Sequence, residues 1–365
     1  MKLIREIKRG IAKHITKAVY NRKYIKPRYT YASKDIAMKL KCSDIKPIDK
    51  TTRKRISEFW KGYPVKIDYR WYDFFNAIDP NTDNLEYYIP HDIYYSIIDA
   101  YYSDIRRAMV FDDKNMYDMY FYDIRRPKTI LHIMDGKILD EKYQPLTLDS
   151  AIAKCKAEKR VIIKPSIDSE GGEGICFWGS NNTESELINI LKSSGKNLIV
   201  QEIAKQSDAL NSLHKESVNT IRVISLIHKG EVKILSAILR MGVNGAQIDN
   251  AAAGGLFCGI NTNGRLKAVA YDTKGLPHTE HPQGGELTKF VIPSFDECLN
   301  LIKYAAPRLS HISKLCSWDL YIDDSDMPRL LEVNLTYGDV QLHQVTNGPI
   351  FGDITPEILN DVFKR

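Results

Sequence analysis

The chain has 365 residues, of which 43% are hydrophobic and 27% are charged, a composition that excludes a mainly disordered or fibrous protein. It holds no apolar run of the roughly 18 residues that a membrane-spanning helix needs, and its first residues show no secretory-signal pattern. The formal net charge is +6, but residues 1–55 hold 18 Lys or Arg against 4 Asp or Glu, so the sequence predicts a basic head and a mildly acidic body.

The cysteines predict a reducing compartment. None of the six forms a CxxC pair, so neither a disulfide framework nor a structural zinc site is expected. Reduced cysteines of this kind predict a cytoplasmic protein. They are Cys42, Cys155, Cys176, Cys258, Cys298 and Cys316.

The first expected element is a basic amphipathic helix over residues 2–19. Apolar side chains recur at helical spacing from Leu3 to Val19, and lysines and arginines fill the other face. One interpretation is peripheral attachment of residues 1–20 to the inner face of a membrane. The alternative is a helix that packs its apolar stripe on its own domain. Nucleic-acid binding is not expected, because no recognised binding motif accompanies the charge.

A tyrosine-rich region follows. Residues 63–122 contain 12 of the 21 tyrosines. Their spacing favours half-buried core residues over the alternative, a surface that stacks on sugar rings. Asp92 is expected to cap a helix that runs to about Met109.

From residue 160 the pattern alternates between short strands, turns and single helices. Strands are expected at 160–164, 175–178 and 197–202, and hairpins pair 217–228 with 231–240, 256–261 with 265–270, and 317–322 with 329–334. Capping boxes at Thr183 and Ser294 predict two helices, and Thr355-Pro356 begins a last one. Hairpins mixed with single helices indicate an α+β fold, not a doubly wound parallel sheet.

A glycine-rich turn is the first motif with chemical meaning. Lys164 precedes Ser169-Glu-Gly-Gly-Glu-Gly174. Glycine lets backbone N–H groups approach phosphate oxygens, and a nearby lysine adds a positive charge. The P-loop spacing is absent and a strand follows, so a plain hairpin turn is the alternative.

A second motif combines Asp319 with Glu332 and Asn334 on neighbouring predicted strands. Residues two apart on a strand share a face, so Glu332 and Asn334 point the same way. Two carboxylates and an amide oxygen suit Mg²⁺. The apolar neighbours favour a metal site over the alternative, a surface strand with alternating polar residues.

Two arginines form a third motif, Arg222 in Asn219-Thr-Ile-Arg222 and Arg240 on the other arm of the same hairpin. Guanidinium groups bind phosphate through paired hydrogen bonds, whereas the alternative is a surface ion pair. The strand end Gln201-Glu202-Ile203 offers backbone N–H and carbonyl groups that could form hydrogen bonds with an adenine ring.

The order of these motifs resembles the ATP-grasp superfamily over about residues 105–350. The resemblance is nearest to the sugar-transfer-associated ATP-grasp group of polysaccharide biosynthesis, and more distant to ATP-grasp ligases that add glutamate. It implies two α+β lobes that grip ATP. The implied segments are a basic helical segment 1–60, a tyrosine-rich domain 61–155, a small lobe 156–205 and a large lobe 206–365.

The resemblance also implies roles for individual residues. ATP would be bound by Lys114, Lys164, Ser169, Gly171, Gly172, Gln201, Glu202, Ile203 and Asn219, with Lys128 a weaker candidate for the first lysine. Asp319, Glu332 and Asn334 would hold Mg²⁺, with two ions expected, and Arg222 and Arg240 would be catalytic. The acceptor would meet Asn250, Gly254, Gly255 and His281.

The activity that the resemblance implies is ADP-forming ligation of a carboxylate to an amine through an acyl-phosphate. The expected product joins an amino acid to a sugar, a uronic acid or amino sugar, in capsule, O-antigen or exopolysaccharide biosynthesis. The alternatives are an ATP-grasp phosphotransferase and a non-catalytic ATP-binding module at the membrane surface.

Overall fold

The computed structural model describes residues 17–18, 20–42, 45–167, 172–246, 254–282 and 286–364. It divides the chain into two compact units, residues 1–105 with 339–365, and residues 106–338. The C-terminal residues, expected in the large lobe, therefore belong with the N-terminal part. Nearly all of the expected basic helix over residues 2–19 lies outside the described residues. Within the described ranges no helix is long and apolar enough to cross a membrane.

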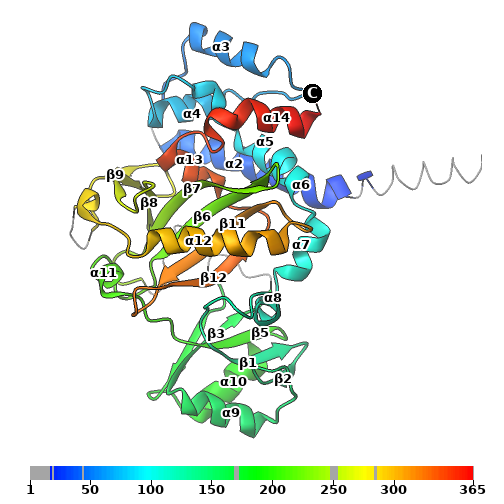
Figure 1. The fold of residues 1–365 in the computed structure, drawn as a ribbon, viewed down its shortest axis with the longest axis vertical. Coiled ribbons are helices and arrows are strands. Elements are labelled where there is room, and N and C mark those ends of the chain that lie inside the picture. The colour runs from blue at the N-terminus through cyan, green and yellow to red at the C-terminus, as the bar shows by residue number, and fades with distance from the viewer. Residues whose placement is uncertain are drawn as a thin grey trace, which may run out of the picture. The chain divides into compact units, whose positions relative to one another are not determined.

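All the named secondary-structure elements in the described part of the first unit are helices or helical turns (Figure 1). Its longer helices are α2 (Lys26–Cys42), α3 (Lys50–Trp60), α4 (Arg70–Ile78), α13 (Val340–Asn347) and α14 (Thr355–Phe363). Its short helical turns are η1 (Asn21–Ile25), η2 (Leu85–Tyr87), α5 (His91–Ile93), η3 (Tyr94–Ile98), α6 (Asp99–Tyr102) and η8 (Gly352–Ile354).

Tyrosines build much of the core of this unit. Tyr72, Tyr88, Tyr94 and Tyr95 are all buried. The Tyr72 hydroxyl donates to the Tyr88 carbonyl at 3.0 Å, so its polar end is satisfied inside the core. These four tyrosines are core residues as predicted, but they are fully buried and not half-buried.

The helix predicted from Asp92 to Met109 is wrong in two ways. Pro90 is the residue before the helix, so Asp92 lies inside its first turn and does not cap it. The helical turns that follow end at Ser103, whose backbone is extended. Helix α7 (Ile105–Phe111) begins anew beyond this break.

The first sheet of the second unit is antiparallel and has five strands in the order β2-β1-β5-β3-β4. Its strands are β1 (Thr129–Met134), β2 (Lys137–Leu139), β3 (Arg160–Pro165), β4 (Cys176–Gly179) and β5 (Leu198–Glu202). Helices α9 (Leu148–Ala157) and α10 (Glu184–Ser193) lie together beside this sheet (Figure 1). The capping box at Thr183 is present as predicted.

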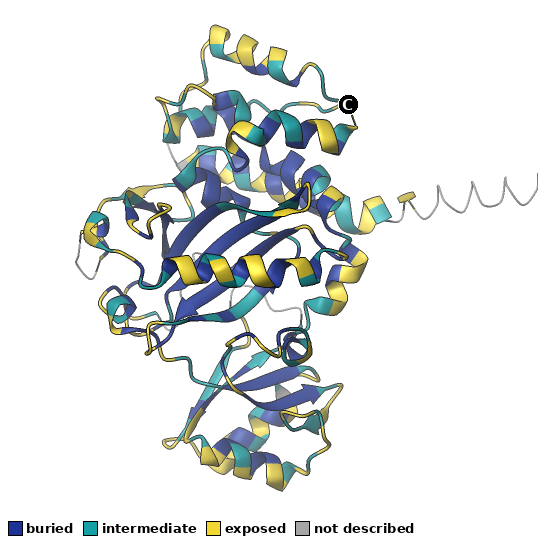
Figure 2. Ribbon diagram, in the orientation of Figure 1, coloured by how far each residue is buried: buried dark blue, intermediate teal, exposed yellow. Residues whose placement is uncertain are grey.

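A seven-stranded antiparallel sheet follows, in the order β10-β9-β8-β7-β6-β11-β12. Its strands are β6 (Thr220–His228), β7 (Glu231–Met241), β8 (Leu256–Ile260), β9 (Leu266–Tyr271), β10 (Pro277–His278), β11 (Leu315–Ile322) and β12 (Pro328–Asn334). The three predicted hairpins are thus confirmed. Most strand residues are buried, as Figure 2 shows.

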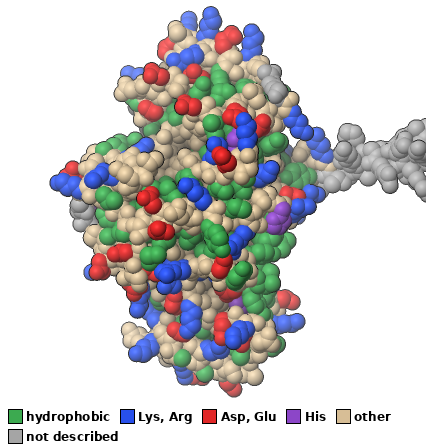
Figure 3. Space-filling view, viewed as in Figure 1, with side chains coloured by type: hydrophobic (Ala, Val, Ile, Leu, Met, Phe, Trp, Pro, Cys, Tyr) green, Lys and Arg blue, Asp and Glu red, His purple; other side chains and the backbone are tan. Residues whose placement is uncertain are grey.

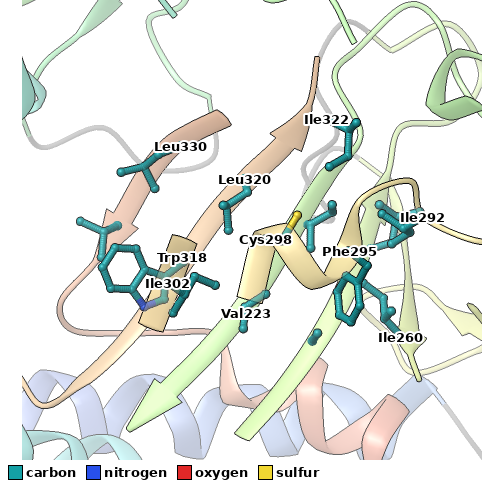
Figure 4. Packing of buried hydrophobic residues seen from close by; sticks show 14 of the residues in the cluster. Val223, Ile260, Ile292, Phe295, Cys298, Ile302, Trp318, Leu320, Ile322 and Leu330 are labelled. Atoms are coloured by element: carbon teal, nitrogen blue, oxygen red, sulfur yellow. The ribbon is translucent and has the colours of Figure 1, made fainter. Parts of the chain in front are cut away.

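Helix α12 (Phe295–Ala305) covers one face of this sheet. Its Cys298 and Ile302 belong to the same apolar core as Trp318 and Leu320 of β11 (Figure 4). The predicted capping box at Ser294 is wrong, because Ser294 has φ +48° and its side chain makes no capping hydrogen bond. The opposite face of the sheet carries the charged side chains described next.

Short helical segments complete the second unit. They are η4 (Lys114–Met116), α8 (Tyr117–Tyr120), α11 (Asp208–Asn211), η6 (Leu287–Lys289) and η7 (Ala306–Leu309).

Candidate functional site

Strand register places three charged side chains side by side. Asp319 of β11 lies opposite Glu332 of β12 and, on its other side, opposite Arg222 of β6. Directly opposite residues of antiparallel strands project from the same face of a sheet. This face lies away from α12, because Trp318, the neighbour of Asp319, is part of the core beneath that helix. Asp319, Glu332 and Arg222 therefore share one face.

Two arginines hold the Asp319 carboxylate. The Nε and Nη2 atoms of Arg222 donate to its two oxygens at 2.6 and 2.5 Å. Arg240 Nη1 donates to Asp319 Oδ2 at 3.5 Å. All three side chains are buried, so charge-assisted hydrogen bonds replace lost hydration. The surface ion pair considered as an alternative is excluded by this burial.

Two lysines bring further positive charge to the same place. Lys114 Nζ lies 2.8 Å from Glu332 Oε1. Burial and then the charge of Lys114 lower the pKa of Lys164 to about 8, while the charge of Glu332 acts in the opposite sense. Lys128, the weaker candidate, is instead exposed and paired with Glu158.

We name six residues the charged cluster: Lys114, Lys164, Arg222, Arg240, Asp319 and Glu332. Among the residues that the structure describes, four cations meet two carboxylates, so these six residues carry an excess of positive charge. Such an excess attracts polyanions, and a triphosphate has the multiple negative charges that would balance it.

The pKa of Lys164 predicts opposite pH effects on stability and on binding. In the folded chain this pKa is about 8, whereas a lysine in the unfolded chain has the usual value near 10.4. Between these two pH values the unfolded chain binds more protons than the folded chain. The free energy of unfolding of the nucleotide-free protein therefore rises with pH in this window. If Lys164 contacts phosphate as the resemblance implies, we expect the affinity for ADP to fall over the same window, because the Lys164 amine loses its charge. Calorimetric titration with ADP and thermal unfolding measure both. Lys164→Met removes both trends, and an ADP affinity that is independent of pH would contradict the assignment.

Tyr117 is a site residue that the sequence pattern did not reveal. Its hydroxyl accepts from the Val333 N–H at 3.1 Å and donates to the Val333 carbonyl at 3.2 Å. Val333 lies between Glu332 and Asn334, and Tyr117 follows η4, which begins with Lys114. The tyrosine thus ties the lysine segment to the strand that carries the carboxylate. Only its short distance from Lys114 in the sequence could have indicated this.

Tyr117→Phe is expected to lower stability by about 1–3 kcal/mol, because it leaves the buried Val333 N–H and carbonyl without their partner. Thermal unfolding measures the loss. Tyr120→Phe is the matched control, because no hydrogen bond of its hydroxyl occurs among the described residues. Equal melting temperatures for the two variants would refute the role of Tyr117.

The residues present fit a divalent cation. Asp319, Glu332 and Asn334 supply the hard oxygen ligands that Mg²⁺ prefers. A carboxylate has about four lone-pair positions, of which the arginines take three at Asp319. The buried Asn334 Nδ2 and the Ser317 Oγ opposite it have no hydrogen-bond partner in the described part of the chain, so this end of the face is prepared for a polar ligand. Ser317 is a further residue that the sequence analysis missed.

The predicted nucleotide-binding turn and strand end are only partly described. Ser169 and Gly171 lie outside the described residues, and Gly172 begins a turn with φ +82°. Gln201 and Glu202 end β5, and Ile203 follows. The Glu202 carboxylate accepts a hydrogen bond from the backbone N–H of Lys128 at 2.9 Å. Its side chain therefore contacts the segment that precedes β1.

Asn219 does not join the charged cluster. It is fully buried, and its Nδ2 donates to the carbonyls of Leu210 and His214 at 3.0 and 2.8 Å. These bonds hold the segment before β6, and the contact of Asn219 with ATP stays a prediction.

Three of the predicted acceptor residues, Gly254, Gly255 and His281, lie near the start of β8 or the end of β7. Gly254 and Gly255 precede β8, whereas Asn250 lies outside the described residues. His281 is buried rather than exposed in a loop, and its Nε2 donates to the Gly242 carbonyl at 2.9 Å. Since Gly242 follows Arg240 by two residues, His281 fixes the end of that strand. Burial lowers the pKa of His281, so it is neutral near pH 7.

Comparison with known families gives one extensive match. The family model described as sugar-transfer-associated ATP-grasp matches residues 97–357. This match confirms the resemblance seen in the motifs and the α+β ATP-grasp fold. No curated protein matches the chain.

Several solved structures are similar at low identity. They include D-alanyl-alanine synthetase A from Vibrio cholerae, with 11% identity, TM-score 0.41 and coverage of 70% of this chain and 67% of that one. N5-carboxyaminoimidazole synthase from Aspergillus clavatus has 9% identity, TM-score 0.40 and coverage of 70% and 53%. The ATP-grasp ligase PsnB, complexed with a precursor peptide and AMPPNP, has 14% identity, TM-score 0.42 and coverage of 72% and 63%. The chain thus spans between about half and two thirds of the length of these three proteins.

Proposed function

The chain belongs to the sugar-transfer-associated ATP-grasp family, and on this premise we propose that it is an ADP-forming carboxylate–amine ligase. The observation that carries the proposal is the charged cluster. Four cations gather about two carboxylates on one sheet face, where they can bind a triphosphate and the anionic group that it activates.

Each member of the cluster has a role in this proposal. Lys114 and Lys164 bind phosphate oxygens, and Arg222 with Arg240 neutralises the charge that spreads over the transferred phosphoryl group. Asp319, Glu332 and Asn334 would hold Mg²⁺, which supplies further charge neutralisation to the phosphates. The amide of Asn334 keeps its Nδ2 available for the substrate, because no protein acceptor in the described part takes it.

The proposed reaction needs no enzyme nucleophile. A substrate carboxylate attacks the terminal phosphorus of ATP, the bond to the bridging oxygen breaks, and ADP leaves. An amine then attacks the acyl carbon of the acyl-phosphate, phosphate departs, and the amine proton passes to solvent. The residues of the cluster contribute position and charge.

The proposed substrates are an amino acid and a sugar, either a uronic acid or an amino sugar. The family description, which associates the group with sugar transfer, supports this choice. The product would be an amide that decorates a capsule, O-antigen or exopolysaccharide precursor.

Release of ADP in the presence of Mg–ATP tests the proposal. Amino acids are combined pairwise with uronic acids and amino sugars, and each compound is also tried alone. The ligase requires two partners and yields one phosphate for each ADP. Release with a single sugar and no free phosphate would instead indicate a phosphotransferase. Tight ATP binding with no release in any combination would favour a non-catalytic binding module.

A further inference from the structure

A buried polar network adjoins Lys114 of the charged cluster. Its centre is Asn115, which follows Lys114 in η4 and is fully buried, as are His132 of β1 and Ser166, the residue directly after β3. Over the five-stranded sheet and its helices the surface mixes basic and acidic side chains (Figure 3), whereas these three residues lie in the interior. We name five residues the Asn115 network: Asn115, Asp118, His132, Tyr143 and Ser166.

The side-chain amide of Asn115 has hydrogen-bond partners at both ends. Its Nδ2 donates to the Ile133 carbonyl at 3.2 Å and to the Ser166 Oγ at 2.9 Å. Because a carbonyl oxygen can only accept, the first of these bonds fixes which end of the amide is the nitrogen. The other end, Oδ1, therefore accepts from the Nδ1 of His132 at 2.9 Å. The amide is satisfied in this orientation and would lose partners in any other.

The imidazole of His132 is held at both nitrogens and on one ring face. Its Nε2 lies 3.2 Å from the Oδ2 of Asp118. Burial by itself would raise the pKa of Asp118, but the hydrogen bond with His132 and the charge of Arg126 lower it to about 2, so this carboxylate is ionised. The Tyr143 ring stacks on the imidazole at 4.3 Å between ring centres, and the Tyr143 hydroxyl donates to the Asn115 carbonyl at 2.5 Å.

The network joins the two segments that carry the lysines of the charged cluster. The Lys114 N–H donates to the Ser166 carbonyl at 2.8 Å, and Asn115 Nδ2 binds the hydroxyl of the same serine. Ser166 follows Lys164 by two residues at the end of β3. A displacement of the Asn115 side chain would therefore move the adjacent Lys114 and disturb its connection to the segment of Lys164.

We propose that His132 is a positioning residue for nucleotide binding, which through Asn115 fixes Lys114 where its ammonium group can meet a phosphate oxygen of ATP. The proposal rests on the proposed function, in which Lys114 binds phosphate. It requires no contact between His132 and the nucleotide. Hydrogen bonds of a connected network in the protein interior support one another, so the loss of one member weakens the others.

A purely structural role for His132 has a different consequence. If the imidazole only stabilised the fold, its loss would lower the melting temperature and leave the affinity of the folded protein for ADP unchanged. A positioning role makes this affinity depend on His132 by way of Lys114. A double-mutant cycle on the two residues measures that dependence.

Calorimetric titration of the full chain with Mg–ADP provides the measurement. His132→Leu, which removes both ring nitrogens, should bind ADP at least about tenfold more weakly than the wild type. Lys114→Met should lose at least as much affinity. The double variant should bind no more weakly than Lys114→Met alone, because the lysine through which His132 acts is already absent.

His228→Leu is the matched control. His228 is also a buried histidine of the second unit, but it ends β6 and lies six residues from Arg222, about 20 Å along the strand. It should bind ADP as the wild type does, whatever its effect on the melting temperature.

Two milder variants test the proposal even where His132→Leu does not fold. The amide nitrogen of His132→Asn can replace Nδ1 as the donor to Asn115, so its ADP affinity should lie within about threefold of the wild type. Tyr143→Phe keeps the stacked ring and loses only the hydroxyl that binds the Asn115 carbonyl. The Tyr143 side chain is partly exposed, and this variant should bind ADP about fivefold more weakly.

The outcomes separate this proposal from the proposed function. Wild-type affinity in folded His132→Leu or in Tyr143→Phe, beside a weakened Lys114→Met, would overturn the positioning role alone. Additive losses in the double variant would overturn it too, since His132 would then act independently of Lys114. Wild-type affinity in Lys114→Met, or no binding of ADP by the wild type, would refute the proposed function at this site and the positioning role with it.

Discussion

Glu332→Gln is expected to reduce ATP-dependent ADP release by at least about a thousandfold while changing the free energy of unfolding by no more than about 1 kcal/mol. The large kinetic effect follows from the loss of the carboxylate that faces Lys114 and that would bind the metal. Stability changes little because the Glu332 side chain is 31% exposed and its ion pair is partly screened. Steady-state rates at several Mg²⁺ concentrations, with thermal unfolding alongside, provide the measurement.

Glu158→Gln is the matched control for this experiment. Its side chain is 27% exposed and pairs with Lys128, so it loses a comparable ion pair away from the charged cluster. It should retain the wild-type rate. A Glu332→Gln enzyme as active as this control would remove Glu332 from the proposed mechanism.

Asp319→Asn is expected to cost about 3–5 kcal/mol of stability as well as nearly all turnover. The carboxylate is buried between Arg222 and Arg240, so an amide in its place removes a negative charge that both buried cations share. Denaturant unfolding measures the first effect and ADP release at low temperature the second. Because the variant has one negative charge fewer beside the two guanidinium groups, pyrophosphate should raise the melting temperature of the variant more than that of the wild type.

A second buried aspartate provides a control that distinguishes a loss of stability from a loss of catalysis. Asp323 accepts from Arg329 Nε at 2.6 Å and is equally buried, but it lies in the turn between β11 and β12. Asp323→Asn should also lose stability, yet retain kcat at temperatures where both variants are folded. Comparable loss of kcat in the two would mean that Asp319 acts only through folding.

The strands that carry the site could be predicted because their signals are local. Alternating residues and the turn Lys229-Gly230, with φ of +51° and +85°, specify the hairpin of β6 and β7. The same pattern predicts β11 and β12, and with them the shared face of Glu332 and Asn334. The helix expected from Asp92 failed because Pro90 and the extended Ser103 moved its start and divided it.

The amino-acid sequence by itself determined the hairpins, the α+β class and the residue types of the charged cluster, since strand alternation, turn chemistry and motif order are properties of short segments. The tertiary structure alone decided which charges meet. The contacts of Arg222 with Asp319, of Lys114 with Glu332 and of the Tyr117 hydroxyl with the Val333 backbone are pairings between residues far apart in the chain. It likewise joined residues 339–365 to the N-terminal unit. Such pairings are selected by burial of the whole core and by the satisfaction of buried polar groups, and no short segment contains that information.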